Sequence, residues 1–362
     1  MTLGAERESF GLAPLASLAY ELGAPAASAI IKQAFADFRV DEQLGFEPNG
    51  EGEHVFLHVR KTDASTVEVA KRIGVVAAVA QADVGYSGMK DRRGETSQWF
   101  SVKLPSEQEG RLAALEDERV SILSTHRNSR KLKIGSHARN RFELRLRGCR
   151  GEPAEFERRL QAIRERGVPT CFGAQRFGAQ MSNLQQVSAL LRGVLAGQGG
   201  ADARRLPRFK RGILFSAARS YLFNQLLSAR VGDGTWSRYV EGDVLGLDGS
   251  GRCFALGVDE AWDEELQRRL ESMDIHITGP LPGRVLAKDR YTPRARAADI
   301  EEVALADSAW LVDGLRAYGL DSARRPLRFR AQELTWRWEP ESAVGVSASP
   351  SRASGAGCVE PD

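Results

Sequence analysis

The sequence predicts an α+β fold in which a strand-rich first part is followed by a helix-rich second part. Up to about residue 163, apolar and polar residues alternate in several short segments, as in half-buried strands of a largely antiparallel sheet. From about residue 183, apolar residues recur at helical spacing instead. Beyond about residue 340 the residues are small, polar and unpatterned, so they form neither kind of element.

Three segments of the first part carry the period-two pattern. They are residues 54–60, 99–104 and 142–147. One helix is predicted between these strands, over residues 65–73, because Ser65 is suited to cap its first turn and Gly74 to end it.

The second part contains three predicted helices. They cover residues 183–196, 216–230 and 298–318. The segment after residue 340 has too little apolar surface to bury, so we expect a flexible tail.

Length and composition exclude several classes of protein. With 362 residues, 42% of them hydrophobic, the chain is long enough for one large or two ordinary domains with a buried core. Its longest apolar run, residues 75–80, is far shorter than the roughly 20 residues that a membrane-spanning helix needs. The polar, acidic N-terminus does not resemble a secretory signal.

The cysteines and histidines have no metal-binding pattern. No two of the four cysteines are spaced as C-x-x-C, and the five histidines are not paired at ligand spacing. We therefore expect no metal site, and reduced thiols in a cytoplasmic protein.

Basic residues are clustered, although the net charge is only +3. Residues 125–150 hold nine Lys or Arg and one acid, and residues 204–211 hold five basic residues and no acid. Such stripes on a nearly neutral chain are typical of a protein that binds a polyanion. A solvated face with its charges paired elsewhere is the alternative.

The segment GYSGMKDRRGETSQWF, residues 85–100, is the first candidate for chemistry. Asp91 is flanked by Lys90, Arg92 and Arg93, and nearby cations favour the ionised form of a carboxylate. An ionised aspartate is suited to act as a nucleophile or a base, and the cations would attract phosphate. The same spacing also fits a surface turn whose charges pair with one another.

The second candidate is the basic segment that leads into the strand at 142–147. It places Arg130, Lys131 and Lys133 ahead of Asn140 and Phe142. An amide can bind a base edge and an aromatic ring can stack on a base, although Phe142 also fits ordinary core packing. Nucleotide hydrolysis, dinucleotide redox chemistry and zinc hydrolysis lack support, because their sequence signatures are absent.

Taken together, these segments resemble the TruD family of tRNA pseudouridine synthases. The segment around Asp91 is similar to the signature of that family's catalytic aspartate. Five further segments match family motifs in the same order: DFRVDEQLGFEPNGEGEHVFLHVRK, RKLKIGSHARNRFELRLR, GVPTCFGAQRFG, SAARSYLFNQ and GPLPG.

The resemblance implies a pseudouridine synthase core, with a largely antiparallel mixed sheet, and an inserted helix-rich domain specific to the family. We expect the first part of the core at residues 1–166, the insertion at 167–329, a return to the core at 330–340 and an atypical flexible tail at 341–362.

The resemblance also implies a reaction and its residues. The family isomerises uridine-13 in the D arm of tRNA, without cofactor or metal. Asp91 would be the catalytic carboxylate, and Lys90 would help to keep it ionised. Phe38 and Phe142 would pack around the uracil, and Asn140 would form a hydrogen bond to it. The expected phosphate contacts are Arg92, Arg93, Arg130, Lys131 and Lys133. We expect a cytoplasmic monomer that binds tRNA and has neither membrane nor protein partners.

The C-terminus departs from the family pattern. After LTWRW, residues 334–338, family members continue with another apolar strand and an aromatic-containing run that reaches the active site, whereas this chain continues into the polar tail. Natural shortening and a shifted reading frame both explain this. The sequence therefore also allows a catalytically impaired protein that binds tRNA, and a sheet left with an unpaired edge.

Overall fold

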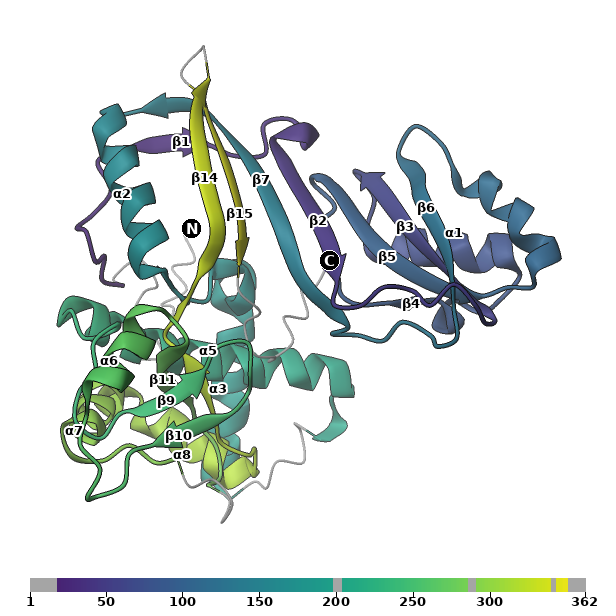
Figure 1. The fold of residues 1–362 in the computed structure, drawn as a ribbon. Helices are drawn as coiled ribbons and strands as arrows, with labels where there is room; N and C mark the ends of the chain where they lie inside the picture. The colour runs from purple at the N-terminus through teal and green to yellow at the C-terminus, as the bar shows by residue number, and fades with distance from the viewer. Residues whose placement is uncertain (1–17, 198–203, 286–290, 340–342, 351–362) are drawn as a thin grey trace, which may run out of the picture. The chain divides into compact units, whose positions relative to one another are not determined.

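The chain divides into two compact units. The computed structural model describes residues 18–197, 204–285, 291–339 and 343–350. The unit that we call the sheet unit contains residues 25–165 and 330–350, and the unit that we call the inserted unit contains residues 18–24 and 166–329 (Figure 1). The inserted unit thus interrupts the sheet unit in the sequence.

The sheet unit is built on one mixed sheet of nine strands in the described residues. Its strands are β1 (Ser28–Ile30), β2 (Phe38–Leu44), β3 (His54–Thr62), β4 (Gly85–Tyr86), β5 (Glu95–Lys103), β6 (Val120–Asn128), β7 (His137–Arg150), β14 (Ala331–Glu339) and β15 (Ala343–Pro350). The order is β14-β15-β7-β2-β5-β3-β6, with β1 on β7 and β4 on β5. Only the β2–β5 pair of these is parallel, so the expected largely antiparallel sheet is confirmed.

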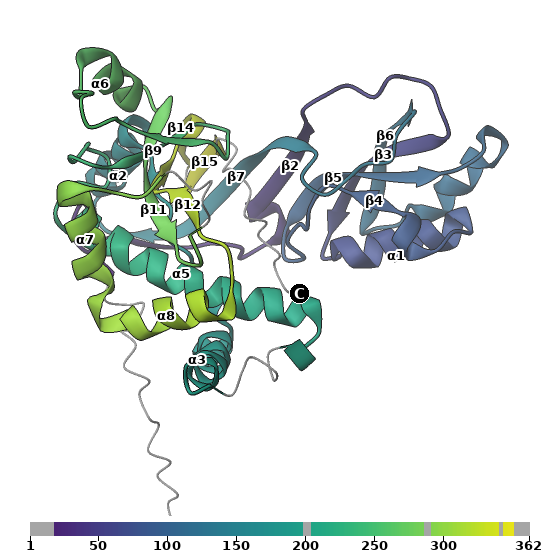
Figure 2. The ribbon, with the colours of Figure 1, turned by 90° about the horizontal axis from the view of Figure 1, so that it is seen from below.

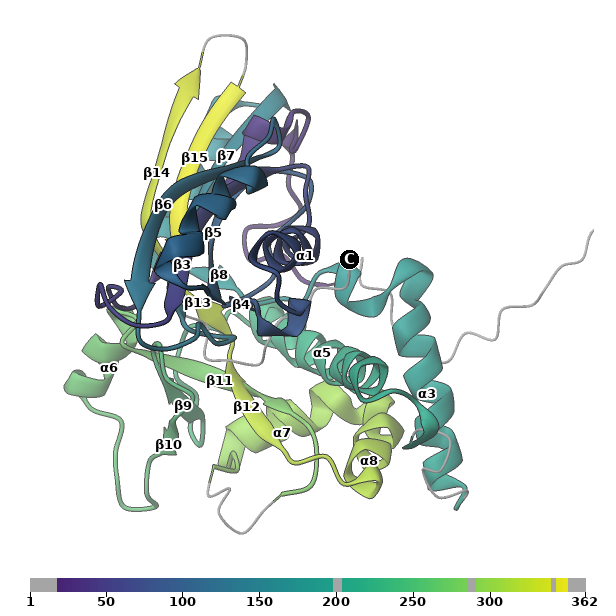
Figure 3. The ribbon, with the colours of Figure 1, turned by 90° about the vertical axis from the view of Figure 1, so that its right-hand side faces the viewer.

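The predicted strands follow from the alternation. The segments 54–60, 99–104 and 142–147 lie in β3, β5 and β7, each of which is longer than predicted. Val55, Leu57 and Val59 of β3 are fully buried against helix α1 (Thr66–Ala77), which lies along one side of the strands (Figure 3). This helix covers only one end of the sheet and leaves β2 and β7 free to carry a site.

Helix α1 begins where the sequence predicts and ends later. The Ser65 hydroxyl accepts the N–H of Glu68, and Glu68 reaches back to the N–H of Ser65. The helix continues past Gly74 to Ala77. It ends there because Ala78 adopts the left-handed conformation. Gly74 lies under the returning chain, where a Cβ would be 3.0 Å from the carbonyl oxygen of Val79.

A further helix, α2 (Pro153–Arg166), closes the first segment of the sheet unit; the sequence did not predict it. It is rich in charge and buries only Ala162, so its apolar stripe is faint. The Glu157 carboxylate accepts the indole N–H groups of Trp336 and Trp338 of β14, both at 2.7 Å. One acidic side chain therefore anchors the helix to β14.

The expectation of a flexible tail is wrong for residues 343–350, which form β15. This strand lies between β14 and β7 and is paired with both, through Val344–Trp338 and Val344–Leu146 among other pairs. The prediction failed because it rested on composition, and most residues of the segment are small and polar. The segment is ordered by backbone hydrogen bonds to the strands on both of its sides. A strand therefore follows LTWRW after all, although most of its residues are small and polar, and the edge at β7 is paired. The other expected tail residues, 341–342 and 351–362, lie outside the described residues.

The inserted unit is helix-rich, as expected. Its elements are β8 (Val168–Pro169), α3 (Ser182–Leu195), α5 (Arg208–Gly232), β9 (Val244–Leu247), β10 (Cys253–Ala255), α6 (Glu264–Glu271), β11 (Ile275–Leu281), α7 (Ala295–Leu305), α8 (Ala309–Tyr318), β12 (Ala323–Pro326) and β13 (Arg328–Phe329). A sheet in the order β10-β9-β11-β12 packs on one side of α5, which runs through the unit (Figure 2). Residues 18–24 also belong to this unit, since the N–H of Ala19 donates to Ser228 at 2.8 Å.

The helix predicted over 298–318 is broken into two. A 3-10 turn, Ala306–Ser308, separates α7 from α8. The break lets the two halves pack on different partners, α7 against α5 and α8 mainly against α3. The helix predicted over 216–230 is longer in the structure, because α5 begins directly after Pro207.

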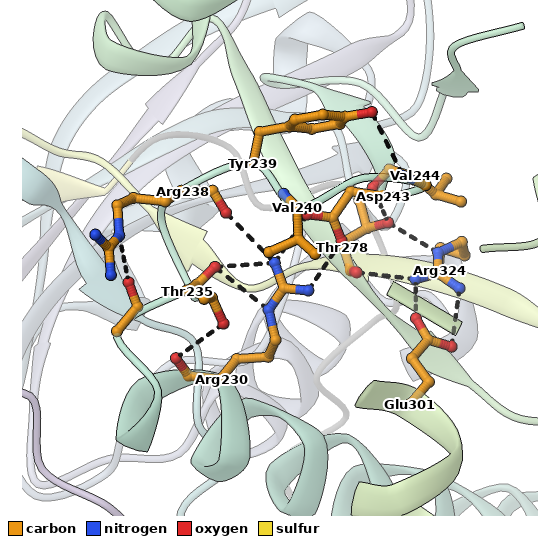
Figure 4. Close-up of polar contacts among 12 residues, drawn as sticks. Arg230, Thr235, Arg238, Tyr239, Val240, Asp243, Val244, Thr278, Glu301 and Arg324 are labelled. Carbon is orange, nitrogen blue, oxygen red and sulfur yellow. Dashed lines mark hydrogen bonds and ion pairs between the residues drawn. The ribbon is translucent and has the colours of Figure 1, made fainter. Parts of the chain in front are cut away.

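A buried ion pair ties the loop after α5 back to that helix. Arg230 and Asp243 contact at 2.9 Å, with side chains only 3% and 4% exposed. The Arg230 guanidinium also donates to the carbonyl of Thr235 at 2.9 Å, and the N–H of Val240 donates to Asp243 at 2.8 Å (Figure 4). Every member of the cluster has a partner, which is the condition under which a buried pair is tolerated.

A second charged group in the same view links four elements. Arg324 of β12 donates to the Thr278 hydroxyl of β11 at 2.8 Å and pairs with Glu301 of α7 (Figure 4). The Thr278 hydroxyl donates in turn to the carbonyl of Val244 in β9 at 2.6 Å.

We expect Asp243→Asn to destabilise the inserted unit strongly. The variant leaves the buried guanidinium of Arg230 without a counter-charge, which costs about 3–5 kcal/mol in comparable sites. Urea unfolding measures the change. The matched control is Asp313→Asn, which removes an exposed pair with Arg316 and should leave the free energy of unfolding nearly unchanged. Equal effects of the two substitutions would contradict this account.

Candidate functional site

The pairing of β2 with β7 brings three of the predicted residues to one face of the sheet. Val40 pairs with Phe142, Glu42 with Asn140, and Phe38 with Leu144. Because side chains alternate along a strand, Phe38 and Phe142 share a face with Asn140. The two rings pack edge to face with centroids 6.2 Å apart.

Asn140 has an unused hydrogen-bonding atom at this face. Its side-chain Oδ1 is inaccessible to solvent and has no hydrogen-bond partner among the described residues. Buried polar atoms are seldom left unpaired, so the amide is available to a ligand that reaches the rings.

Asp91 lies in the loop between β4 and β5, and a buried lysine holds that loop. Lys61 of β3 is 1% exposed. Its ammonium donates to the backbone carbonyls of Ala64 at 2.6 Å, Asp91 at 2.9 Å and Lys90 at 3.3 Å. The backbone of Asp91 is thereby fixed to the sheet, while its side chain is 29% exposed.

The structure does not bring Lys90 to Asp91. The Lys90 ammonium is buried against Glu42 of β2, at 2.5 Å, and the backbone N–H of Lys90 donates to the hydroxyl of Thr66 at 2.9 Å. Glu42 also accepts the N–H of Trp99 at 3.1 Å. Lys90 therefore joins the loop to β2 and α1, instead of pairing with the neighbouring carboxylate.

The cation that contacts Asp91 is Lys32, which the sequence analysis missed. Its ammonium forms an ion pair with Oδ2 of Asp91 and lies 3.9 Å from the centroid of the Phe38 ring. A single lysine thus links the carboxylate to the aromatic wall. No pattern marks Lys32 in the sequence, because 59 residues separate it from Asp91.

A second ion pair positions Phe38. Asp37 is 2% exposed, and its carboxylate accepts two hydrogen bonds from the guanidinium of Arg147 in β7, both at 2.8 Å. These bonds hold the pKa of the Asp37 carboxyl below its usual value; burial opposes them, and the N–H of Ala34 adds to them. The residue before Phe38 is therefore locked to the strand that carries Phe142.

The predicted phosphate contacts lie on two loops of the sheet unit. Arg93 is exposed beside Asp91, and Arg92 is exposed but pairs with Asp63 at 3.0 Å. Arg130, Lys131 and Lys133 lie on the loop 129–136 between β6 and β7. That loop touches the Asp91 loop, since the N–H of Gly135 donates to the carbonyl of Ser87 at 2.7 Å.

The second basic cluster lies in the inserted unit. Arg204, Arg205, Arg208 and Lys210 are exposed ahead of and within the first turn of α5.

Two classes of feature are missing from the described residues. They contain no group of three or more His, Cys, Asp or Glu side chains placed to hold a metal ion. None of their helices is long and apolar enough to cross a membrane.

The arrangement is suited to chemistry on a planar ring. A partly exposed carboxylate is suited to act as a nucleophile or a base. Lys32 balances its charge, the Phe38 and Phe142 rings form an apolar wall, and the amide of Asn140 is available to polar ring atoms.

We expect Lys61→Met to loosen the Asp91 loop. The methionine keeps the length of the side chain but removes three hydrogen bonds to backbone carbonyls. Hydrogen–deuterium exchange of residues 88–94 should speed up by about tenfold or more. Lys103→Met is the control, because Lys103 forms an exposed ion pair with Glu53 and should not change exchange in that loop. Unchanged exchange in Lys61→Met would refute the assignment.

We expect Asp37→Asn to reduce stability in a pH-dependent way. Because the folded-state pKa of Asp37 is lowered, the stabilisation is complete above the ordinary carboxyl pKa of about 4 and is lost as the pH falls through the folded-state value. Urea unfolding of wild type and variant should therefore differ near pH 6 and converge in acid. A difference that stays constant with pH would show that the ion pair is not its origin.

Comparison with known proteins gives consistent matches over almost the whole chain. A family model described as tRNA pseudouridine synthase D (TruD) matches residues 16–197 and 200–347. The protein named tRNA pseudouridine synthase D of Methylococcus capsulatus is 45% identical over 314 residues, covering 86% of this chain and 84% of that protein. The one of Xanthomonas axonopodis pv. citri is 42% identical over 336 residues, covering 91% and 89%.

A solved structure supports the same fold. The chain matches the crystal structure named as the TruD protein of Methanosarcina mazei, with a TM-score of 0.73 over 96% of this chain and 94% of that one. At 18% sequence identity, this likeness speaks for the architecture alone.

Proposed function

The chain belongs to the tRNA pseudouridine synthase D family of isomerases, and on that premise we propose that it converts uridine-13 in the D arm of tRNA to pseudouridine, with Asp91 as the catalytic carboxylate. The family membership confirms the resemblance seen in the sequence motifs. One observation carries the assignment of the site: the Lys32 ammonium contacts both the Asp91 carboxylate and the Phe38 ring.

The reaction rearranges one nucleotide. The N1–C1′ bond of uridine breaks, the uracil turns, and a C5–C1′ bond forms, while the proton on C5 moves to the solvent or to N1. Substrate and product are isomers, so no atom is supplied or removed. The base first leaves its stack, which costs a few kcal/mol. An enzyme for this step needs a carboxylate and a pocket that holds the detached ring.

The site residues supply both needs. Asp91 attacks the sugar, attacks the base or removes a proton, and the rigid loop on Lys61 keeps it in place for any of these. Phe38 and Phe142 pack on the uracil, as stacking of a base contributes about 1–3 kcal/mol. The unpaired Oδ1 of Asn140 accepts a hydrogen bond from the polar edge of the ring.

The basic loops bind the tRNA backbone in this proposal. Arg92, Arg93, Arg130, Lys131 and Lys133 lie on the two touching loops that carry Asp91 and the 129–136 turn. Positive side chains on adjoining loops are suited to successive phosphates. The sheet unit would then be the catalytic core, and the inserted unit, with its cluster before α5, would add contacts to the tRNA.

We expect Asp91→Asn to reduce isomerisation by at least about 10²- to 10⁴-fold while binding of tRNA changes little. The amide keeps the size of the side chain but cannot act as a nucleophile or a base. Release of tritium from 5-tritiated uridine in a tRNA transcript measures the rate, and filter retention measures binding.

Asp63→Asn is the matched control, because the Asp63 carboxylate is nearby and forms an exposed ion pair with Arg92. It should keep the rate within about twofold. A wild-type protein that binds tRNA without isomerising it, or an Asp91→Asn variant at the wild-type rate, would overturn the proposal.

A further inference from the structure

An open hollow lies beside the loop that carries Asp91, and of the residues given a role above it contains only Lys131 and Lys133. It has a volume of about 730 Å³. Its lining residues are Gln81, Ala82, Val84, Gly85, Tyr86, Lys131, Leu132, Lys133 and Ile134. None of them is Asp91, Phe38, Asn140 or Phe142, so the hollow is separate from the candidate active site. Its size is within the range of about 300–1,000 Å³ typical of sites for small ligands.

The two walls of the hollow are held together by backbone contacts. Gly85 of β4 approaches the carbonyl oxygen of Leu132 so closely that a Cβ would be 2.4 Å from it. The N–H of Leu132 donates to the hydroxyl of Ser101 at 2.9 Å, and Lys131 donates to the carbonyl of Ala82 at 2.8 Å. The same backbone contacts that form the hollow therefore also hold the start of the Asp91 loop in place.

The floor of the hollow is apolar. Val84 and Leu132 are buried at its base, and Tyr86 packs edge to face against Phe100 behind it. Ile134 is 83% exposed at the tip of the 129–136 loop. An exposed isoleucine alone needs no explanation, but here it continues an apolar surface that is already concave.

The rim of the hollow is cationic. Lys131 and Lys133 are among its lining residues, and none of the lining residues is acidic. Gln81 adds a side-chain amide, which has both a donor and an acceptor. An apolar floor, a side-chain amide and ammonium groups at the rim match a nucleotide, whose base is largely apolar on its faces and whose phosphate is negative.

We propose that this hollow binds one unpaired nucleotide of the tRNA other than the target uridine, with the base on the apolar floor and the phosphate at Lys131 and Lys133. The proposal rests on the proposed function and names a second RNA contact for it. A second anchored nucleotide beside the Asp91 loop would hold the RNA in register while the target base leaves its stack.

Two substitutions test the hollow without touching Asp91. Ala82→Trp fills it with an indole from an exposed position, and Ile134→Ala removes the apolar side chain at the loop tip, which is too exposed to matter for folding. Val75→Trp is the matched control, because Val75 is an aliphatic residue of the same unit that is 74% exposed on α1.

The readout is the binding of tRNA transcripts that carry a single abasic nucleotide, scanned along the chain and measured by fluorescence anisotropy. In the wild type, one abasic position other than 13 should weaken binding by about 5- to 100-fold. Ala82→Trp should weaken binding of the intact transcript by a similar factor. Removing the base at that position should then weaken binding to this variant no further. Ile134→Ala should change both measurements in the same direction as Ala82→Trp, but by a smaller factor.

The possible outcomes separate the two proposals. If Ala82→Trp and Ile134→Ala bind the intact transcript as tightly as Val75→Trp does, or remain as sensitive as the wild type to every abasic position, the hollow does not hold a nucleotide of the tRNA. Failure of the wild type to isomerise uridine would overturn the proposed function instead, because the binding scan does not depend on turnover.

Discussion

The register of β2 against β7 is the constraint on which the site depends. Pairing Val40 with Phe142 and Glu42 with Asn140 places the rings and the amide on one face. A slip of β2 by one residue would send Phe38 to the face opposite Phe142 and Asn140, since side chains alternate along a strand. The ion pair of Asp37 and Arg147 fixes the start of β2 against β7 and so supports this register at one end.

The lysines near Asp91 have three distinct roles, which the fold assigns. Lys61 binds the backbone of the loop, Lys90 binds Glu42 of β2, and Lys32 binds the carboxylate itself. The first two are almost completely buried, so each occupies a defined place instead of sampling solvent. The cation in contact with the Asp91 carboxylate therefore comes from the segment before β2, and not from Lys90, its neighbour in the chain.

The C-terminal strand shows how far pairing can override composition. The segment AVGVSASP has few large apolar residues, yet it forms β15 between two longer strands. Its buried residue Val344 lies in the row that joins Trp338 to Leu146. Hydrogen bonds on both edges and a few apolar side chains are enough to order it, whereas neither partner strand can be inferred from the segment alone.

The sequence by itself determined the α+β class, the main strands and helices, the cap of α1 at Ser65 and, through ordered motifs, the family. It also pointed to Asp91, Phe38, Asn140 and Phe142, which lie together in the sheet unit, although their roles remain part of the proposal. Only the tertiary structure decided that Lys32 and not Lys90 contacts Asp91, that β15 is ordered, and that a hollow adjoins the Asp91 loop. Patterns along a chain report periodicity and local hydrogen bonding, but a contact across 59 residues exists only once packing has brought its two partners together.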